Sequence, residues 1–206
     1  MSHLVNIITA GQALEKAKKV LIMVHGRGGT ATEILHMSTY LKVDGFALLA
    51  PQAANYTWYP YSFMAARERN EPWLTSAIQV LADTVQQAQD NGVKTENIYF
   101  FGFSQGACLI LEYLAQHANR YGGAAAIIGG LIGEEIDTSK YQGDFGQMPL
   151  FIGTSDPDPH VPLQRVQASV AILKNMNANV QLSIYPNFEH SVNQDEIAIA
   201  NTFVFG

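Results

Sequence analysis

The sequence contains a single cysteine, Cys108, among 206 residues. One cysteine excludes an intramolecular disulfide, so the fold has to be held together by its apolar core. A chain without disulfides suits a reducing compartment, and we therefore expect a cytoplasmic protein.

Long apolar runs are also missing. No stretch approaches the roughly 20 consecutive apolar residues that a membrane-spanning helix needs. Residues 1–20 carry Glu15, Lys16, Lys18 and Lys19 where an export signal would have a continuous apolar segment. We expect a protein that does not span a membrane and is not exported.

Positive charge is scarce as well. The chain has 12 lysines and arginines against 18 aspartates and glutamates, which gives a net charge of -6, and the basic residues form no cluster. A nucleic-acid-binding surface needs clustered basic side chains that neutralise phosphates. This composition excludes nucleic acid as the expected partner.

Apolar residues, by contrast, make up 48% of the chain and charged residues 15%, which suits one globular domain spanning residues 1–206. Short apolar runs alternate with longer segments whose apolar residues recur at helical spacing. This alternation is typical of an α/β fold with a mostly parallel central sheet and helices on both faces. We expect strands at residues 4–8, 20–24, 46–49, 98–101, 124–128, 150–152 and 180–185, the first at an edge, and helices at 30–41, 72–91, 107–118, 162–176 and 193–203.

One connection, residues 51–70, is long and dense in aromatic residues. Such a segment either lines a ligand pocket or folds onto the sheet as additional core. We expect the pocket, with Trp58 and Tyr59 lining it together with Phe103 from the segment described next.

The most informative segment is Gly102-Phe103-Ser104-Gln105-Gly106, which lies between a predicted strand and a predicted helix. In a G-x-S-x-G turn, the serine sits on a bend so tight that its neighbours two positions away must lack side chains. The bend leaves the hydroxyl exposed above the sheet. We therefore predict that Ser104 is a nucleophile.

A serine hydroxyl needs a base within hydrogen-bond reach, and the base needs an acid that fixes its tautomer. In folds with this turn the order along the chain is Ser, then Asp or Glu, then His. Asp156 and Asp158 follow the predicted strand 150–152, and His190 follows the strand 180–185. Because these residues come just after the carboxyl ends of strands, where ligands bind to open parallel sheets, either aspartate could partner His190.

Acyl transfer also needs two backbone N–H groups that stabilise the oxyanion. The residue after the nucleophile, Gln105, supplies one, and the glycine-rich segment 25–29 after the strand 20–24 is expected to supply the other through Arg27. Those glycines could also suggest a phosphate-binding loop, but no Gly-Lys-Ser/Thr follows them.

The residues Asp156, Asp158 and His160 could imitate a metal site. The interleaved Pro157 and Pro159 and the absence of another clustered ligand argue against one. We expect neither a metal nor a cofactor.

Together, His25-Gly26-Arg27-Gly28-Gly29, Gly102–Gly106, Asp158-Pro159-His160-Val161-Pro162 and His190 resemble the phospholipase/carboxylesterase group of the α/β-hydrolase superfamily, which includes the acyl-protein thioesterases. Trp58-Tyr59-Pro60 and Asn70–Leu74 are similar to a bacterial carboxylesterase branch of that group.

The resemblance implies a single α/β-hydrolase domain in which Ser104 is the nucleophile and His190 the base. It favours Asp158 as the acid, because Asp158 begins the complete Asp-Pro-x-Val-Pro string, and leaves Asp156 as the alternative. Glu189 departs from the glycine common in the family before the histidine, and could crowd the site or add negative charge beside the base.

The expected function is hydrolysis of small carboxylic esters, or of thioesters, through an acyl-enzyme. The expected partner is a small-molecule ester, with a homodimer left open. Two alternatives use the same fold: a ligand-binding protein without catalysis, and a hydrolase of lactones or carbon–carbon bonds.

Overall fold

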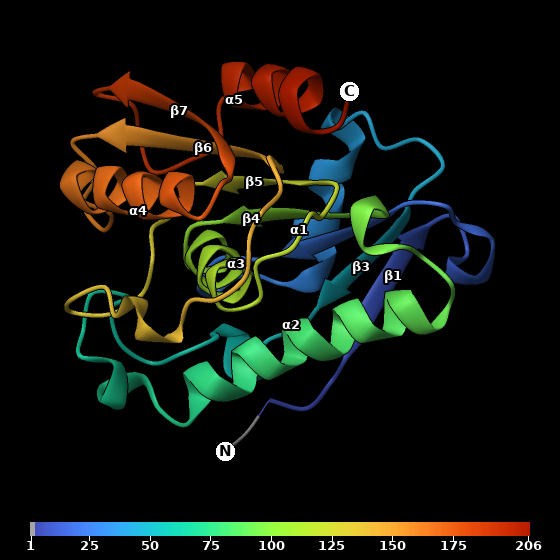
Figure 1. The fold of residues 1–206 in the computed structure, drawn as a ribbon, viewed down its shortest axis with the longest axis horizontal. Coiled ribbons are helices and arrows are strands. Elements are labelled where there is room, and N and C mark those ends of the chain that lie inside the picture. Colours follow the sequence, from blue (N-terminus) through green and yellow to red (C-terminus); the bar gives the residue numbers. More distant parts are fainter. Residues whose placement is uncertain (1–2) are drawn as a thin grey trace.

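The structure, a computed structural model that describes residues 3–206, is built on one seven-stranded sheet (Figure 1). The strand order is β1-β3-β2-β4-β5-β6-β7; β1 pairs antiparallel with β3 at one edge, and all other pairs are parallel. The strands are β1 (Ile7–Gly11), β2 (Val20–Val24), β3 (Ala47–Pro51), β4 (Ile98–Phe103), β5 (Gly123–Ile127), β6 (Pro149–Asp156) and β7 (Asn179–Pro186).

Five α-helices connect or follow these strands: α1 (Ala31–His36), α2 (Trp73–Asp90), α3 (Gln105–Gln116), α4 (Leu163–Asn175) and α5 (Gln194–Ile199). A 3₁₀ turn (Met37–Tyr40) extends α1, and a π turn (Ala200–Val204) extends α5. Because parallel crossovers are right-handed, the connections that run in opposite directions along the sheet lie on opposite faces. Helix α1 therefore covers the face opposite α2, α3 and α4 (Figure 1).

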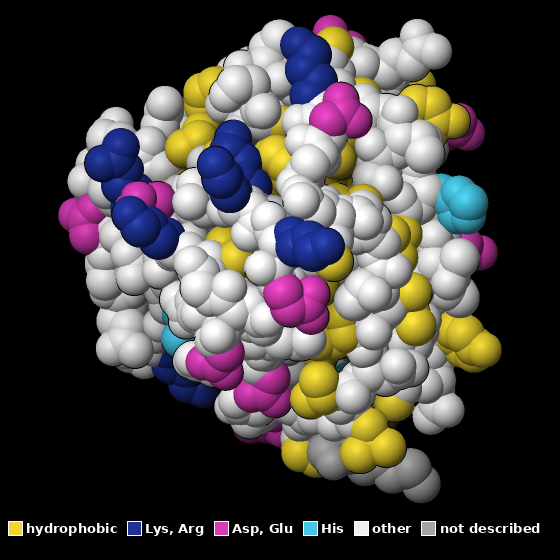
Figure 2. Space-filling view, turned by 90° about the vertical axis from the view of Figure 1, so that its right-hand side faces the viewer, with side chains coloured by type: hydrophobic (Ala, Val, Ile, Leu, Met, Phe, Trp, Pro, Cys, Tyr) yellow, Lys and Arg dark blue, Asp and Glu magenta, His cyan; other side chains and the backbone are white. Residues whose placement is uncertain are grey.

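The predicted fold class and the edge position of the first strand are confirmed. The first strand is displaced, since it occupies residues 7–11 and not 4–8. Strands β2 and β5, which flank the central strand β4, are buried at every position, and this agrees with their continuous apolar sequences. None of the helices described in residues 3–206 has the length and apolar character needed to cross a membrane. On the face drawn in Figure 2, basic side chains are interspersed with acidic ones.

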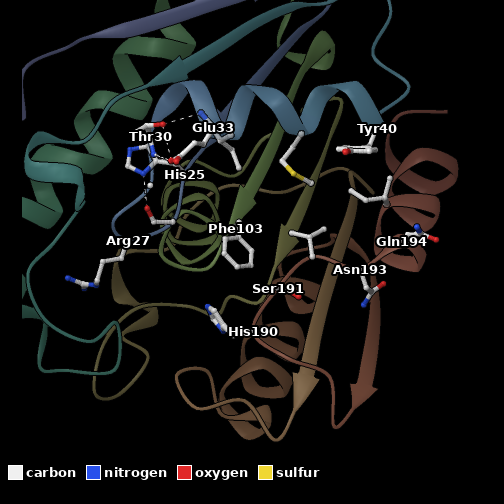
Figure 3. Close-up of a pocket in the computed structure, with 16 residues that line it drawn as sticks. His25, Arg27, Thr30, Glu33, Tyr40, Phe103, His190, Ser191, Asn193 and Gln194 are labelled. Atoms are coloured by element: carbon white, nitrogen blue, oxygen red, sulfur yellow. Dashed lines mark hydrogen bonds between the residues drawn. The ribbon is translucent and has the colours of Figure 1, made fainter.

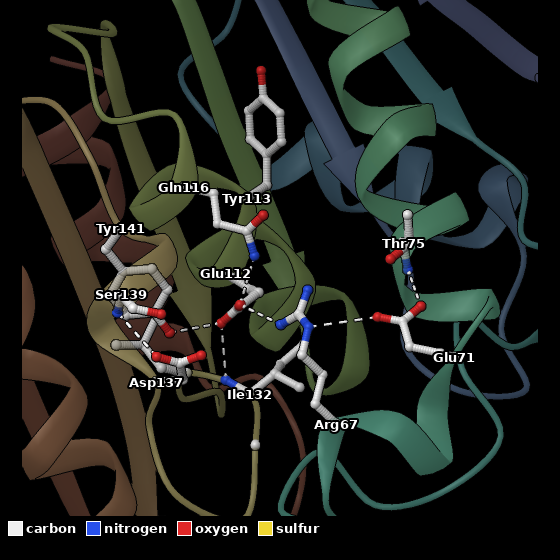
Figure 4. A network of polar contacts seen from close by, with 12 residues as sticks. Arg67, Glu71, Thr75, Glu112, Tyr113, Gln116, Ile132, Asp137, Ser139 and Tyr141 are labelled. Atoms are coloured by element: carbon white, nitrogen blue, oxygen red, sulfur yellow. Dashed lines mark hydrogen bonds and ion pairs between the residues drawn. The ribbon is translucent and has the colours of Figure 1, made fainter.

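A buried carboxylate, that of Glu112 in α3, links this helix to two long connections (Figure 4). Its Oε1 accepts hydrogen bonds from Arg67 Nη1 and Gln116 Nε2, both at 2.7 Å. Its Oε2 accepts from the Ile132 backbone N–H at 3.2 Å and from the Tyr141 hydroxyl at 2.9 Å. The carboxylate therefore anchors the segments before α2 and after β5 to α3, the helix that follows Ser104.

The start of α5 is fixed by a second buried carboxyl, that of Glu196, which is 1% exposed. Asn193 and Glu196 form a reciprocal capping box, in which each side chain accepts from the other's backbone N–H. A Cβ on Gly153 of β6 would lie 2.9 Å from Glu196 Cγ, so only glycine leaves room for this side chain. Burial raises the pKa of Glu196 to about 7.

Replacing Arg67 with Met is expected to leave the Glu112 carboxylate buried without its cation. We expect a loss of roughly 3 kcal/mol in the free energy of unfolding, measured by urea denaturation. The double variant Arg67→Met/Glu112→Gln should lose less, because no buried charge then remains unpaired. Lys94→Met breaks an exposed ion pair with Glu96 and serves as the control, with a change within about 0.5 kcal/mol. Equal losses in the single and double variants would contradict this account.

The pKa of Glu196 predicts a pH dependence of stability. The unfolded carboxyl ionises near its ordinary value of 4.5 and the folded one near 7, so ionisation favours the unfolded chain between these pH values. The contribution of Glu196 is therefore complete below pH 4.5 and is lost as the pH rises to about 7. Across this interval the free energy of unfolding of the wild type should fall by about 3 kcal/mol relative to that of Glu196→Gln, whose side chain does not titrate. A constant difference between the two proteins from pH 4 to 8 would refute the shift.

Candidate active site

The serine turn has the backbone that its sequence predicts. Ser104 joins β4 to α3 with φ of 53° and ψ of -118°, a conformation that side chains rarely adopt. A Cβ on Gly102 would lie 2.6 Å from Ile110 Cδ1, and one on Gly106 would lie 2.6 Å from the His25 carbonyl oxygen. Gly106 is required because α3 starts directly against the end of β2, and Gly102 because the first turns of α3, including the Gly106 carbonyl at 2.9 Å, lie against the end of β4.

His190 lies between Ser104 and Asp158. Its Nε2 is 2.9 Å from Ser104 Oγ, and its Nδ1 is 2.7 Å from Asp158 Oδ2. An ionised carboxylate only accepts hydrogen bonds, so Nδ1 carries the proton and Nε2 is left to accept from the serine hydroxyl. The structure thus brings together three side chains that are 86 and 32 positions apart in the chain.

Asp158, and not Asp156, contacts the histidine. The Asp158 side chain is 0% exposed, its Oδ1 accepts from the backbone N–H groups of His160 and Val161, and its Oδ2 also accepts from Ser155 Oγ. Burial by itself raises the pKa of this carboxyl, but the hydrogen bonds from His190, His160 and Val161 outweigh burial and hold it below its ordinary value. Asp156 is the last residue of β6 and is exposed.

Within residues 3–206, the backbone N–H groups of Arg27 and Gln105 donate no hydrogen bond to another protein atom, and both residues line the elbow pocket together with Ser104. The side chains of both residues hold one aromatic segment, residues 57–61. The Arg27 guanidinium donates to Thr57 Oγ1, the Pro60 carbonyl and the Tyr61 carbonyl at 3.0, 3.0 and 2.7 Å. Gln105 accepts from the Trp58 N–H at 2.9 Å and donates to the Tyr59 carbonyl at 2.8 Å.

The His25 side chain has a structural role beside the site. Its Nδ1 donates to the Gly26 carbonyl at 2.7 Å, and its Nε2 accepts from the Ala53 N–H at 3.2 Å. The ring is 2% exposed, and burial lowers its pKa, so it is neutral. It fixes the segment that carries Arg27.

Two cavities border the Ser104–His190 pair. The first, which we name the α1–α5 groove, has a volume of about 820 Å³ and lies between α1 with its 3₁₀ turn and residues 191–197 (Figure 3). The second, the elbow pocket, has a volume of about 630 Å³ and lies between the serine turn and residues 59–63 and 159–161. Gly26, Arg27, Phe103 and His190 line both cavities, so these four residues form the wall between them.

The three predicted substrate-contacting residues have different positions. Phe103 lines both cavities, and Tyr59 lines the elbow pocket although it is only 1% exposed. The prediction for Trp58 is wrong: the side chain is 0% exposed and lines neither cavity. Its indole Nε1 donates to the His25 carbonyl at 2.9 Å, and its ring packs 5.0 Å from the imidazole of His25, so it is part of the core.

Other residues near the site were not assigned to it from the sequence. The His160 ring packs edge-on against His190 at 5.1 Å. Ile34, Met37, Val192 and Ile197 line the α1–α5 groove, and they come from distant helices and loops with no shared pattern. Glu189, which we considered as a possible obstruction, is exposed.

Comparison with known proteins agrees with this geometry. A model of the Phospholipase/Carboxylesterase family matches residues 6–205. The chain is 28% identical to acyl-protein thioesterase 1 of Kluyveromyces lactis over 179 residues, which cover 77% of this chain and 78% of the thioesterase.

Solved structures show the same similarity. A crystal structure of a phospholipase/carboxylesterase from Dyadobacter fermentans is 48% identical, covers 100% of this chain and 99% of its own, and superposes with a TM-score of 0.99. The carboxylesterase of Bacillus cereus, at 18% identity with 98% and 94% coverage, shares the fold with a TM-score of 0.80. The resemblance predicted from the sequence is confirmed, and the chain belongs to the Phospholipase/Carboxylesterase family of α/β hydrolases.

Proposed function

We propose that this protein hydrolyses small carboxylic esters or thioesters through an acyl-enzyme, with Ser104 as nucleophile, His190 as general base and Asp158 as its orienting acid. The observation that carries the proposal is the continuous hydrogen-bonded series from Ser104 Oγ through the His190 ring to Asp158. Membership of a carboxylesterase family supports the reaction class.

In the proposed reaction, Ser104 Oγ attacks the carbonyl carbon while His190 Nε2 takes the hydroxyl proton. The imidazolium is stabilised by the Asp158 carboxylate, whose pKa lies below its ordinary value and which therefore stays ionised. His190 then returns the proton to the leaving oxygen or sulfur as its bond to the acyl carbon breaks. Water, deprotonated by the same histidine, attacks the acyl-enzyme, and His190 gives this proton to Ser104 Oγ as the acyl–oxygen bond breaks, which releases the carboxylic acid and restores the free enzyme.

The negative charge that develops on the carbonyl oxygen requires preorganised donors. We assign this role to the backbone N–H groups of Arg27 and Gln105. Their side chains support the assignment, because both are held by residues 57–61, and this anchoring fixes the direction of the two N–H groups before the substrate arrives.

We also propose a cytoplasmic location. The support is compositional: the chain has one cysteine, and Cys108 is a buried free thiol.

Ser104→Ala is the direct test of the nucleophile. We expect turnover of p-nitrophenyl acetate to fall by at least roughly 10³-fold, because no acyl-enzyme can form. Circular dichroism should show an unchanged fold. A folded variant that retains more than a tenth of the wild-type rate would refute the assignment.

The two aspartates form a matched pair of variants. Asp158→Asn is expected to lower kcat by roughly 10³–10⁴-fold, because an amide cannot stabilise the imidazolium and favours the wrong tautomer. Asp156→Asn should retain kcat within a few-fold, since this side chain is exposed and outside the series. The measurement is kcat for p-nitrophenyl acetate at pH 8. The opposite ranking would assign the acid to Asp156.

A further inference from the structure

The two cavities do not border the reacting groups in the same way. His190 borders both cavities, but Ser104 and Gln105 line only the elbow pocket and not the α1–α5 groove (Figure 3). In the proposed reaction the acyl portion stays bonded to the serine, and the leaving oxygen receives its proton from the histidine. The acyl portion therefore fits the elbow pocket, and the leaving group fits the groove.

The surface of the groove is mainly apolar. Phe103 lines it beside His190, with a distance of 5.3 Å between the two rings, and Ile34, Met37, Val192 and Ile197 also line it. Tyr40, whose side chain is 66% exposed, is a further lining residue, and it lies away from His190 in Figure 3. A volume of about 820 Å³ is ample for a bulky hydrocarbon or aromatic group.

The charges of the groove oppose an anionic ligand. Glu33 lines it, and one of its carboxylate oxygens accepts from Thr30 N–H and Oγ1 at 2.8 and 2.9 Å. Arg27 is the one lysine or arginine among the lining residues within 3–206, and its guanidinium already donates to three oxygens of residues 57–61. His25 is neutral. Among the described residues that line the groove, no free lysine or arginine is therefore available to pair with a carboxylate or phosphate on the ligand.

We propose that the α1–α5 groove binds the alcohol or phenol portion of the ester and selects leaving groups that are bulky, apolar and free of negative charge. The proposal rests on the proposed function and adds to it the substrate class and the assignment of the two cavities. Met37 and Glu33 are then specificity-determining residues.

Two series of esters test the assignment. In the first series the acid is always acetate and the alcohol changes from ethanol to 1-naphthol. In the second series the alcohol is always p-nitrophenol and the acyl chain lengthens from acetyl to hexanoyl. Met37→Trp fills the groove, so we expect kcat/KM to fall at least tenfold more for 1-naphthyl acetate than for ethyl acetate. The dependence on acyl length in the second series should keep the wild-type pattern.

Ser62→Trp is the matched control, because Ser62 lines the elbow pocket. It should change the dependence on acyl length and leave the ratio of naphthyl to ethyl acetate within about threefold of the wild type. Val192→Phe narrows the groove by a smaller amount and replaces Met37→Trp if that variant does not fold. The proposal is overturned if the groove variants change the acyl dependence and Ser62→Trp changes the alcohol dependence.

The charge preference has its own test with two aryl acetates of similar size, phenyl acetate and 4-acetoxybenzoate. The wild type should prefer phenyl acetate at least tenfold in kcat/KM, after correction for the different reactivities of the two esters in alkaline hydrolysis. Glu33→Gln keeps the hydrogen-bond acceptor but removes the charge, and it should narrow the preference by a few-fold. Equal turnover of the two esters by the wild type would overturn the charge selection.

These outcomes are separable from the proposed function. A folded Ser104→Ala variant that still hydrolyses esters would remove the function itself. An inactive Ser104→Ala variant combined with reversed specificity changes would remove only the assignment of the groove.

Discussion

The close approach of α3 to the end of β2 is the constraint on which the site depends. A Cβ on Gly106 would collide with the Val24 and His25 carbonyl oxygens, so the helix can begin there only because position 106 has no side chain. This contact forces the bend at Ser104 and brings the N-terminus of α3 beside the segment that carries Arg27. The proposed nucleophile and both proposed oxyanion donors are therefore positioned by one backbone contact.

The two residues proposed as oxyanion donors also shape the elbow pocket through their side chains. Arg27 and Gln105 hold the aromatic segment 57–61, which in turn forms part of the elbow pocket. Trp58 completes this arrangement from inside the core, through its hydrogen bond to the His25 carbonyl. The hydrogen bonds from the Arg27 and Gln105 side chains to residues 57–61 therefore set both the shape of the elbow pocket and the direction of the proposed oxyanion donors.

The sequence predicts the positions of most strands and the serine turn well, because apolar runs and glycine spacing are local signals. It does not decide between Asp156 and Asp158, since that depends on where β6 ends. The strand continues to Asp156, which pairs with Pro186 of β7, and only the residues beyond it can turn back toward His190. Trp58 is mispredicted because aromatic content does not reveal whether a side chain faces a cavity or the core. The groove is invisible in the sequence, since Met37 and Val192 come together only through the fold.

The central claim is that the hydrogen-bonded series makes the Ser104 hydroxyl reactive. Cys108, which also lines the elbow pocket, is the nearby competitor, but burial raises the pKa of its thiol to about 12 and keeps it neutral. Peptide mapping by mass spectrometry after reaction with a fluorophosphonate tests the claim most directly. The account predicts a single adduct on Ser104 in the wild type and no adduct in His190→Ala. An adduct on Cys108, or labelling of Ser104 that persists without His190, would contradict it.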